Sequence, residues 1–386
     1  RLLRVCCQIG GVAGGDRQHL GLASSRLVDG RELSGNLDAA RDDRGDLSRV
    51  EHAIADMSFL SAFTIILQTA MKRLASLLQI AIAAALVIVL SPGLASAEQK
   101  EVIAYESFQK GRPVRVTAEI YWPDKQGPVP AMVIHHGSSG VGQREKGLAR
   151  ELAAMGVAGV VIDSFGPRGV SSTTRDQNAV NAADFNQDAI RALITLGQDK
   201  RIDRSKIGIM GFSKGGTSTI VTSYERLMSA WGVAPGLRYA LHVAFYPACP
   251  VQYWKPQTTG APIYMLLGGA DTYVGVEPCQ TYAERMRATG AQVEVQIYPN
   301  AAHGFDGTGA PWFDKQGENY SQCVFQQQAD GSWIERKSGI RISSAEAQDN
   351  PSMAPSAKAA FDGCRTLGIS GGPNEAARAQ SLAAWW

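Results

Sequence analysis

The segment 207–216 restricts the possible folds of this chain more than any other part of its sequence. It begins as a short apolar run, passes through Gly211-Phe212-Ser213-Lys214-Gly215 and continues into residues that favour a helix. A serine in a sharp strand-to-helix turn is exposed at the end of a sheet, and glycines beside it lack the Cβ atoms that would clash there. The segment therefore predicts a strand joined directly to a helix, with Ser213 as a candidate nucleophile. The G-x-S-x-G pattern alone also arises by chance, so the surrounding elements decide what it means.

Apolar runs and amphipathic segments alternate from residue 101 onward. We expect strands at 102–108, 114–122, 131–134, 157–162, 207–210, 239–246, 262–267 and 292–298. We expect helices at 144–155, 184–196, 214–229 and 277–289. The first two strands should form an antiparallel pair, and the continuous apolar strands after them indicate a mostly parallel sheet with helices on both faces. The predicted fold class is therefore α/β.

This alternation stops after about residue 305. Asp330-Gly331 is typical of a tight turn and predicts a small hairpin within 323–342, while 374–386 favours a terminal helix. We expect residues 306–386 to be an appendage of a sheet domain that occupies 98–386 and has its core at about 101–305.

Two polar side chains follow the last two predicted strands of the sheet, Asp271 after the first of them and His303 after the second. The carboxyl ends of parallel strands meet at one edge of a sheet, so both side chains should lie near Ser213. The chain order serine, aspartate, histidine suits a nucleophile, an orienting carboxylate and a general base. Asp271 could instead stabilise a turn, and His303 could be an ordinary loop residue. Asp163 is an alternative acid, whereas Asp306 stands too close to His303 in the sequence.

The strand predicted at 131–134 runs into the loop His135-His136-Gly137-Ser138-Ser139-Gly140, whose glycines would let the backbone approach a substrate. We expect the backbone N–H groups of Ser138 and Lys214 to form an oxyanion hole. The alternative is a plain glycine-rich turn with a histidine that faces solvent.

These motifs carry a family resemblance. The histidine–glycine loop, Asp163–Gly169, the serine turn, Asp271 and His303-Gly304-Phe305 together resemble the dienelactone hydrolase family of α/β-hydrolases over residues 101–305. The resemblance implies the α/β-hydrolase fold and hydrolysis of a small-molecule ester or lactone without a metal or organic cofactor. The namesake enzymes carry cysteine at the nucleophile, where this chain has Ser213, and this difference favours a serine esterase.

Four side chains are candidates for contact with the substrate: His136, Phe165, Arg168 and Trp254. A structural salt bridge is the alternative for Arg168. Further aromatic residues that could line an acyl or alcohol pocket, or belong to the core, are Tyr253, Trp312 and Phe313.

Two other functional classes remain open. A serine peptidase of a related fold is one, although such peptidases usually carry an extra gating domain for which this chain has little room. The other is a non-catalytic binding protein on a hydrolase scaffold, against which the intact Ser213, Asp271 and His303 argue.

Residues 98–386 hold four cysteines and an almost balanced charge, with 28 Lys and Arg against 27 Asp and Glu. The balance gives no indication of a nucleic-acid or anionic-membrane partner. An even number of cysteines in an exported chain suggests two disulfides, and we favour Cys249–Cys279 and Cys323–Cys364 because both pairs would tie loops to neighbouring elements. Four buried free thiols are the alternative.

An export signal is predicted at 71–97. Met71-Lys72-Arg73 precedes the apolar run 80–90, and Ala95-Ser96-Ala97 has the small residues that signal peptidase reads. The apolar run is short for a membrane-spanning helix, so we favour cleavage over a retained anchor and expect a periplasmic or secreted protein. Residues 1–70 show no sustained periodicity, and we expect an over-extended or disordered leader, with Met71 or Met57 as the true start.

The first testable expectation is that the native protein begins at Glu98. Intact-mass measurement and N-terminal sequencing of the protein from its own cells should place the first residue there. An uncleaved 71–97 segment would favour the membrane anchor, and any peptide from 1–56 would contradict the over-extended leader.

Overall fold

The computed structural model describes residues 99–347, 351 and 354–385, together with 68, 71–76 and 78–79. The chain divides into two compact units, and Ala97–Trp386 belong to one of them. In the other unit, the described residues are helical. The predicted apolar run at 80–90 and the cleavage site at 95–97 lie outside the described residues. None of the helices in the described part is long and apolar enough to cross a membrane.

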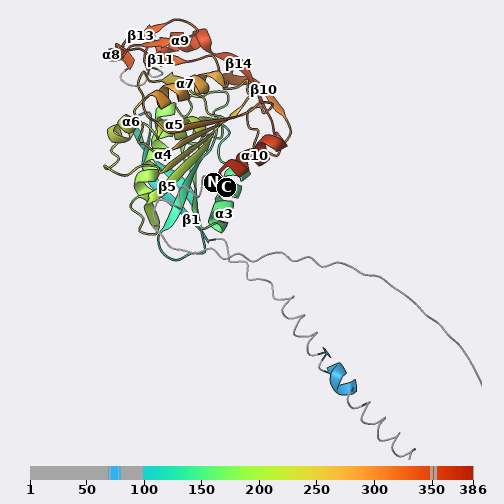
Figure 1. The fold of residues 1–386 in the computed structure, drawn as a ribbon. Helices are drawn as coiled ribbons and strands as arrows, with labels where there is room; N and C mark the ends of the chain where they lie inside the picture. The colour runs from blue at the N-terminus through green and yellow to red at the C-terminus, as the bar shows by residue number, and fades with distance from the viewer. Residues whose placement is uncertain are drawn as a thin grey trace, which may run out of the picture. The chain divides into compact units, whose positions relative to one another are not determined.

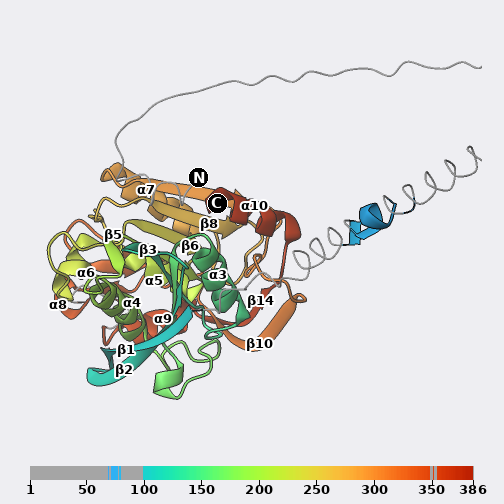
Figure 2. The same cartoon turned by 90° about the horizontal axis from the view of Figure 1, so that it is seen from below.

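An eight-stranded sheet forms the centre of the unit, in the order β1-β2-β4-β3-β5-β6-β8-β9 (Figures 1 and 2). β2 is antiparallel to both β1 and β4, and every pairing from β4 to β9 is parallel. The strand bounds are β1 Gln99–Gln109, β2 Arg112–Trp122, β3 Val129–His135, β4 Ala158–Asp163, β5 Ile202–Phe212, β6 Leu241–Phe245, β8 Ile263–Gly268 and β9 Val293–Tyr298. The predicted mostly parallel α/β sheet is therefore confirmed.

Helices cover both faces of this sheet. α3 and α10 lie side by side over one face, and α4 to α7 pack on the other (Figures 1 and 2). The helix bounds are α3 Gln143–Ala154, α4 Ala182–Leu196, α5 Lys214–Val221, α6 Glu225–Ala230, α7 Glu277–Ala288 and α10 Glu375–Trp385. Strands buried on both faces must be apolar along their whole length, which explains the continuous apolar runs in the sequence.

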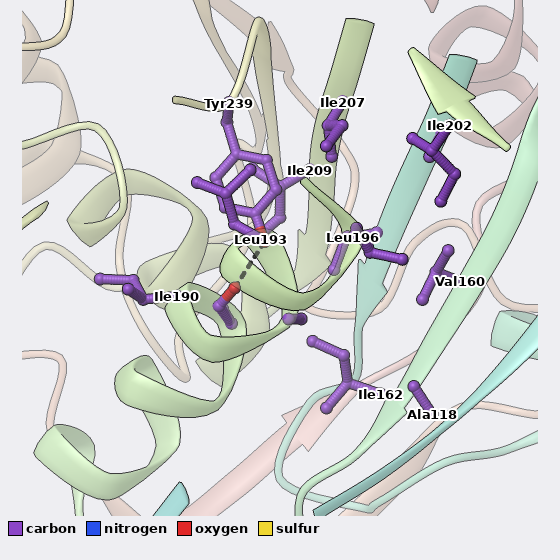
Figure 3. Packing of buried hydrophobic residues seen from close by; sticks show 14 of the residues in the cluster. Ala118, Val160, Ile162, Ile190, Leu193, Leu196, Ile202, Ile207, Ile209 and Tyr239 are labelled. Atoms are coloured by element: carbon purple, nitrogen blue, oxygen red, sulfur yellow. Dashed lines mark hydrogen bonds between the residues drawn. The ribbon is translucent and has the colours of Figure 1, made fainter. Parts of the chain in front are cut away.

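The core beneath α4 shows how the layers lock together (Figure 3). Ile190, Leu193 and Leu196 of α4 pack on the inward side chains of β4 and β5, and all are at most 1% exposed. The Tyr239 hydroxyl, fully buried here, donates a hydrogen bond to the Ala189 carbonyl at 2.6 Å. The Tyr239 hydroxyl therefore has the hydrogen-bond partner that burial of a hydroxyl demands.

The prediction of a single helix at 214–229 is wrong, because the structure has two helices there, α5 and α6. Tyr224 leaves the helical path and pairs with Thr258 in an isolated antiparallel bridge. The Glu225 N–H then donates to the Gln257 carbonyl at 3.1 Å instead of to the preceding helical turn. The helix is therefore interrupted by hydrogen bonds to residues 257–258, more than thirty residues further along the chain. The sequence near Tyr224 does not predict these bonds.

The C-terminal appendage contains a four-stranded and a two-stranded sheet (Figure 1). The four-stranded sheet includes one strand from the sheet domain, β7 Val251–Gln252, which pairs with β11. The elements of the appendage itself are β10 Trp312–Asn319, β11 Phe325–Gln327, β12 Trp333–Glu335, β13 Arg341–Ile342, α8 Ser344–Ala347, α9 Ala357–Cys364 and β14 Thr366–Gly371, followed by α10. The predicted hairpin is confirmed as β11 and β12, joined through Asp330-Gly331. The antiparallel pair β10–β14 was not predicted, since its strands are separated by about fifty residues.

Both predicted disulfides are present. Cys249–Cys279 joins the loop after β6 to α7, and Cys323–Cys364 joins the segment after β10 to the end of α9. The second bond closes a sequence separation of 41 residues immediately before β14. It therefore restricts the unfolded chain in the part that has the smallest core.

We expect the double substitution Cys323→Ser and Cys364→Ser to lower the free energy of unfolding by about 3–4 kcal/mol, the chain-entropy value for a loop of this length. Equilibrium urea unfolding of the purified protein measures the change. An unchanged unfolding midpoint would show that the bond contributes nothing to stability.

Candidate active site

Ser213 lies in a strained turn between β5 and α5. Its φ of 56° and ψ of −114° are unusual for a residue other than glycine. The turn depends on close backbone contact, because a Cβ atom on Gly211 would lie 2.1 Å from the Gly215 carbonyl oxygen. A Cβ atom on Gly215 would lie 2.1 Å from the carbonyl oxygen of His135 in β3. Both glycines are therefore required for the geometry that exposes the serine.

The structure brings Ser213, His303 and Asp271 together in a hydrogen-bonded line. His303 Nε2 lies 2.9 Å from Ser213 Oγ, and Nδ1 lies 2.7 Å from Asp271 Oδ2. A carboxylate can only accept, so neutral His303 carries its proton on Nδ1 and presents Nε2 as the acceptor for the serine hydroxyl. Asp271 Oδ1 accepts from the backbone N–H groups of Tyr273 and Val274 at 2.9 and 3.1 Å. The carboxylate is therefore fixed in place and turned toward the imidazole.

The two other acids considered for this role are engaged elsewhere. Asp163 Oδ1 accepts from the backbone N–H groups of Phe165 and Gly166 and so stabilises its own turn. Asp306 accepts a hydrogen bond from the Tyr246 hydroxyl. Of these three carboxylates, only that of Asp271 is hydrogen-bonded to His303.

Two tyrosines that the sequence analysis did not identify hold the His303 ring between them. The ring centroids of Tyr246 and Tyr273 lie 4.7 and 4.6 Å from that of His303. Tyr246 follows β6 with a φ of 35°, and its hydroxyl accepts from Arg144 at 2.7 Å while donating to Asp306. A tyrosine directly after a strand of the parallel sheet was the signal that could have indicated its position at the site edge.

The predicted oxyanion loop passes directly beside the nucleophile. A Cβ atom on Gly137 would lie 3.4 Å from Ser213 Cβ. The Ser138 carbonyl accepts from Thr173 N and Ser172 Oγ, and in the described part of the chain no partner is found for the Ser138 N–H. Lys214 opens α5, so its N–H is one of the helix donors without an intrahelical acceptor. Neither predicted donor thus has a hydrogen-bond acceptor within the described residues, and their role in an oxyanion hole stays a prediction.

The paired histidines of this loop are fully buried. His135 contacts Ser218 Oγ and Ser164 Oγ through its two ring nitrogens, at 3.2 and 3.0 Å. His136 donates from Nδ1 to its neighbouring Gly137 carbonyl at 2.7 Å and accepts from Ser164 N through Nε2. Burial lowers the pKa of both imidazoles, so both are neutral at pH 7.

Three of the four predicted substrate contacts require correction. His136, Phe165 and Arg168 have side chains that are at most 1% exposed. Arg168 forms a buried ion pair with Asp188 at 2.7 Å, the structural alternative, and the other two pack beneath the loop. Trp254 is 47% exposed beside the appendage strand β11, to which its backbone N–H is bonded through Gln327.

The aromatic residues predicted to line a pocket lie in different parts of the structure. Trp312 lies edge-on to Tyr273, with 6.4 Å between ring centroids, and is 42% exposed. Phe313, next to it on β10, is 71% exposed. Tyr253 instead packs on Tyr224 of the sheet domain and on Trp333 of the appendage, between the two cores. Of these three aromatic residues, Trp312 is the one that contacts Tyr273 beside the site.

The Lys214 side chain turns away from the nucleophile into a cage of carbonyl groups. Its ammonium donates to the Gln177 carbonyl at 2.9 Å, the Val180 carbonyl at 2.7 Å and Gln177 Oε1 at 3.3 Å. Burial lowers the pKa of this ammonium to about 7, although the charges of Asp176 and Glu318 oppose the shift. Sequence alone contained no signal for this cage, because 176–180 has no regular pattern.

A parallel sheet with a nucleophile turn and a serine–histidine–aspartate line at its carboxyl edge defines the class of α/β-hydrolases. Residues 116–328 match the model of the dienelactone hydrolase family. The chain belongs to that family, whose members are hydrolases of carboxylic esters.

Individual relatives are distant. A protein named as a carboxymethylenebutenolidase from Methylorubrum extorquens is 28% identical over 192 residues, which are 47% of this chain and 65% of the relative. A protein named as a 2-oxo-3-(5-oxofuran-2-ylidene)propanoate lactonase from Bradyrhizobium is 25% identical and covered to 76%, with 47% of this chain matched. This chain thus spans about two thirds to three quarters of the length of these relatives.

Solved structures of similar fold include a dienelactone hydrolase from Klebsiella pneumoniae, at 20% identity, with 53% of this chain and 89% of that chain covered and a TM-score of 0.41. A thermophilic esterase from Thermogutta terrifontis is 21% identical, and the match covers 54% of this chain and 84% of the esterase with a TM-score of 0.42.

The buried Lys214 predicts a specific pH dependence of stability. Its pKa of about 7 in the folded state lies below the ordinary value of 10.5, so between these pH values the unfolded state binds more protons. The free energy of unfolding of the wild type, relative to Lys214→Met, should therefore rise as the pH increases from about 7 to 10. Below pH 7 the cost of burying the charge is fully present. Urea unfolding of both proteins between pH 7 and 10 measures this difference in the free energy of unfolding. A difference that does not change with pH would contradict the prediction.

Proposed function

We propose that this chain is an exported serine hydrolase that cleaves carboxylic ester or lactone bonds through Ser213, His303 and Asp271. The observation that carries the proposal is the continuous line of two hydrogen bonds, 2.9 and 2.7 Å, from serine to imidazole to carboxylate. A serine hydroxyl is a weak nucleophile, and an acceptor nitrogen at this distance is the group that activates it.

The reaction follows from this arrangement in two halves. Ser213 Oγ attacks the ester carbonyl carbon while His303 Nε2 removes the hydroxyl proton, and Asp271 stabilises the resulting imidazolium. The negative oxygen of the tetrahedral intermediate accepts from the Ser138 and Lys214 N–H groups. When the intermediate collapses, His303 returns the proton to the departing alcohol. Water, activated by the same imidazole, then attacks the acyl-enzyme and releases the acid and free Ser213.

The substrate class is a small-molecule ester or lactone. Lactone-cleaving names among the relatives and the family match favour this class. The exposed Trp312 beside Tyr273 offers an apolar surface next to the reacting groups. A serine in place of the cysteine of the namesake enzymes favours simple esters over dienelactone. Export is supported by the predicted signal segment and by two disulfides, which persist in an oxidising compartment.

A serine peptidase remains the second candidate, on one observation. A 152-residue segment is 26% identical to an acylamino-acid-releasing enzyme of rice, of which it covers 19%. Hydrolysis of p-nitrophenyl esters without hydrolysis of matched peptide amides would favour the esterase, and the reverse would favour the peptidase.

A fluorophosphonate probe tests the nucleophile directly. The wild type should be labelled at Ser213 and should hydrolyse short-chain p-nitrophenyl esters. Ser213→Ala should lose both the label and the activity, and Asp271→Asn should lower kcat on the order of 10⁴-fold, because the imidazole then loses its orienting acceptor. Ser205→Ala, at an exposed serine on β5, is the matched control and should behave as wild type. A folded wild type that is neither labelled nor active would favour a non-catalytic binding protein.

A further inference from the structure

The β10–β14 pair of the appendage contacts the loops of the active site on three sides. Asn319 Nδ2 at the end of β10 donates to the Thr272 carbonyl at 3.0 Å, next to the triad aspartate. The Gly372 N–H after β14 donates to the carbonyl of His303 at 2.9 Å. A carboxylate of the same strand, Glu318, accepts from the backbone N–H of Gln177 at 2.8 Å. The pair therefore contacts the loop after Asp271, the loop of His303 and the segment that holds Gln177.

Gln177 occupies the point where both predicted oxyanion residues meet. Its Nε2 lies 3.1 Å from Ser138 Oγ and 3.3 Å from the Tyr273 hydroxyl. Its backbone carbonyl and its Oε1 both accept from the Lys214 ammonium. One residue thus joins the loop that supplies one oxyanion donor to the side chain of the residue that supplies the other.

Glu318 holds Gln177 in this position from the side of the appendage. Glu318 is 7% exposed, and each of its carboxylate oxygens has a charged or N–H partner. Oε2 accepts from Gln177 N, and Oε1 forms an ion pair with Arg365. Arg365 directly follows Cys364, and the disulfide from Cys364 to Cys323 links the segment that carries Arg365 to the segment after Glu318. The backbone is tied as well, because Glu318 N donates to the Thr174 carbonyl at 2.9 Å.

We propose that Gln177 and Glu318 are positioning residues for the oxyanion hole: Glu318 fixes Gln177, and Gln177 fixes the Ser138 loop relative to the nucleophile turn. This inference rests on the proposed hydrolase function of the same site. Neither residue needs to touch the substrate, since the effect passes through Ser138 Oγ and the Lys214 ammonium. The C-terminal appendage thereby becomes part of the catalytic apparatus.

The physical reason lies in how sharply oxyanion stabilisation depends on distance. A donor must lie within about 3 Å of the place where negative charge develops, and the loss of one donor costs about 10²- to 10³-fold in kcat. A loop that shifts by a fraction of an ångström loses part of this factor while ground-state binding is hardly changed. The signature of a positioning role is therefore a fall in kcat at nearly constant KM.

The test compares Gln177→Ala and Glu318→Ala with a matched control, Arg175→Ala. Arg175 pairs with Asp314 in an exposed ion pair that joins the same loop to the same strand without reaching the site. We expect kcat for p-nitrophenyl ester hydrolysis to fall about 10- to 100-fold in the two test variants. KM should stay within about threefold. The affinity of an alkylboronic acid, which mimics the tetrahedral intermediate, should weaken in proportion to kcat. Arg175→Ala should keep wild-type values, and Glu318→Gln, which can still accept from Gln177 N, should recover part of kcat.

Unchanged kcat in Gln177→Ala would overturn the inference, as would a loss confined to KM with unchanged boronate affinity. If Glu318→Ala does not fold, Gln177→Met, which keeps the volume and the backbone contacts of the glutamine, decides the question by the same measurements. A wild type that neither hydrolyses esters nor reacts with the fluorophosphonate would overturn the proposed function and this inference together. An active wild type beside fully active variants would overturn this inference alone.

Discussion

The site depends on the close approach of three backbone segments at the nucleophile turn. β5 ends at the turn, and the chain continues as α5, whose first residues lie against the end of β3. The contacts are so close that there is no room for a side chain at Gly211 or Gly215. The cost of holding Ser213 in a sparsely populated conformation is met by the packing of the parallel sheet around it. Strain of this kind persists only where the surrounding structure determines it.

Around this turn, several buried polar side chains have defined hydrogen-bond partners. The imidazole of His303 is enclosed by two tyrosine rings and oriented by a carboxylate that backbone N–H groups hold. Beneath the loop, the buried Arg168 and Asp188 neutralise one another, and both guanidinium terminal nitrogens also reach backbone carbonyls. An unpaired charge here would be very costly, so these contacts are required for the loop to exist. They set the shape of the site without joining its chemistry.

Much of this arrangement could be predicted because it follows from strand ends. Ser213 comes directly after an apolar strand, Asp271 and His303 stand in the loops that follow β8 and β9, and parallel strands bring such positions to one edge. The disulfide pairs were also predictable, since only four cysteines lie in 98–386. Contacts that join distant, irregular segments could not be predicted. The bridge that splits the helix at Tyr224 is of this kind, as is the bond from Glu318 to Gln177. The predicted substrate contact of Arg168 was wrong because sequence alone does not distinguish a buried arginine from one that binds substrate. The structure makes the distinction by showing its ion-pair partner, Asp188 on α4.

The bond from Gly372 to the His303 carbonyl has a consequence for the order of events during synthesis. β3, β5, β8 and β9, which supply the serine turn and both loops of the triad, precede β14 by at least about seventy residues. During synthesis, the segments that form these strands therefore leave the ribosome before the segment that bonds to the histidine loop has been made. The last contact of the site to be synthesised thus comes from a segment that contributes no reacting group to it.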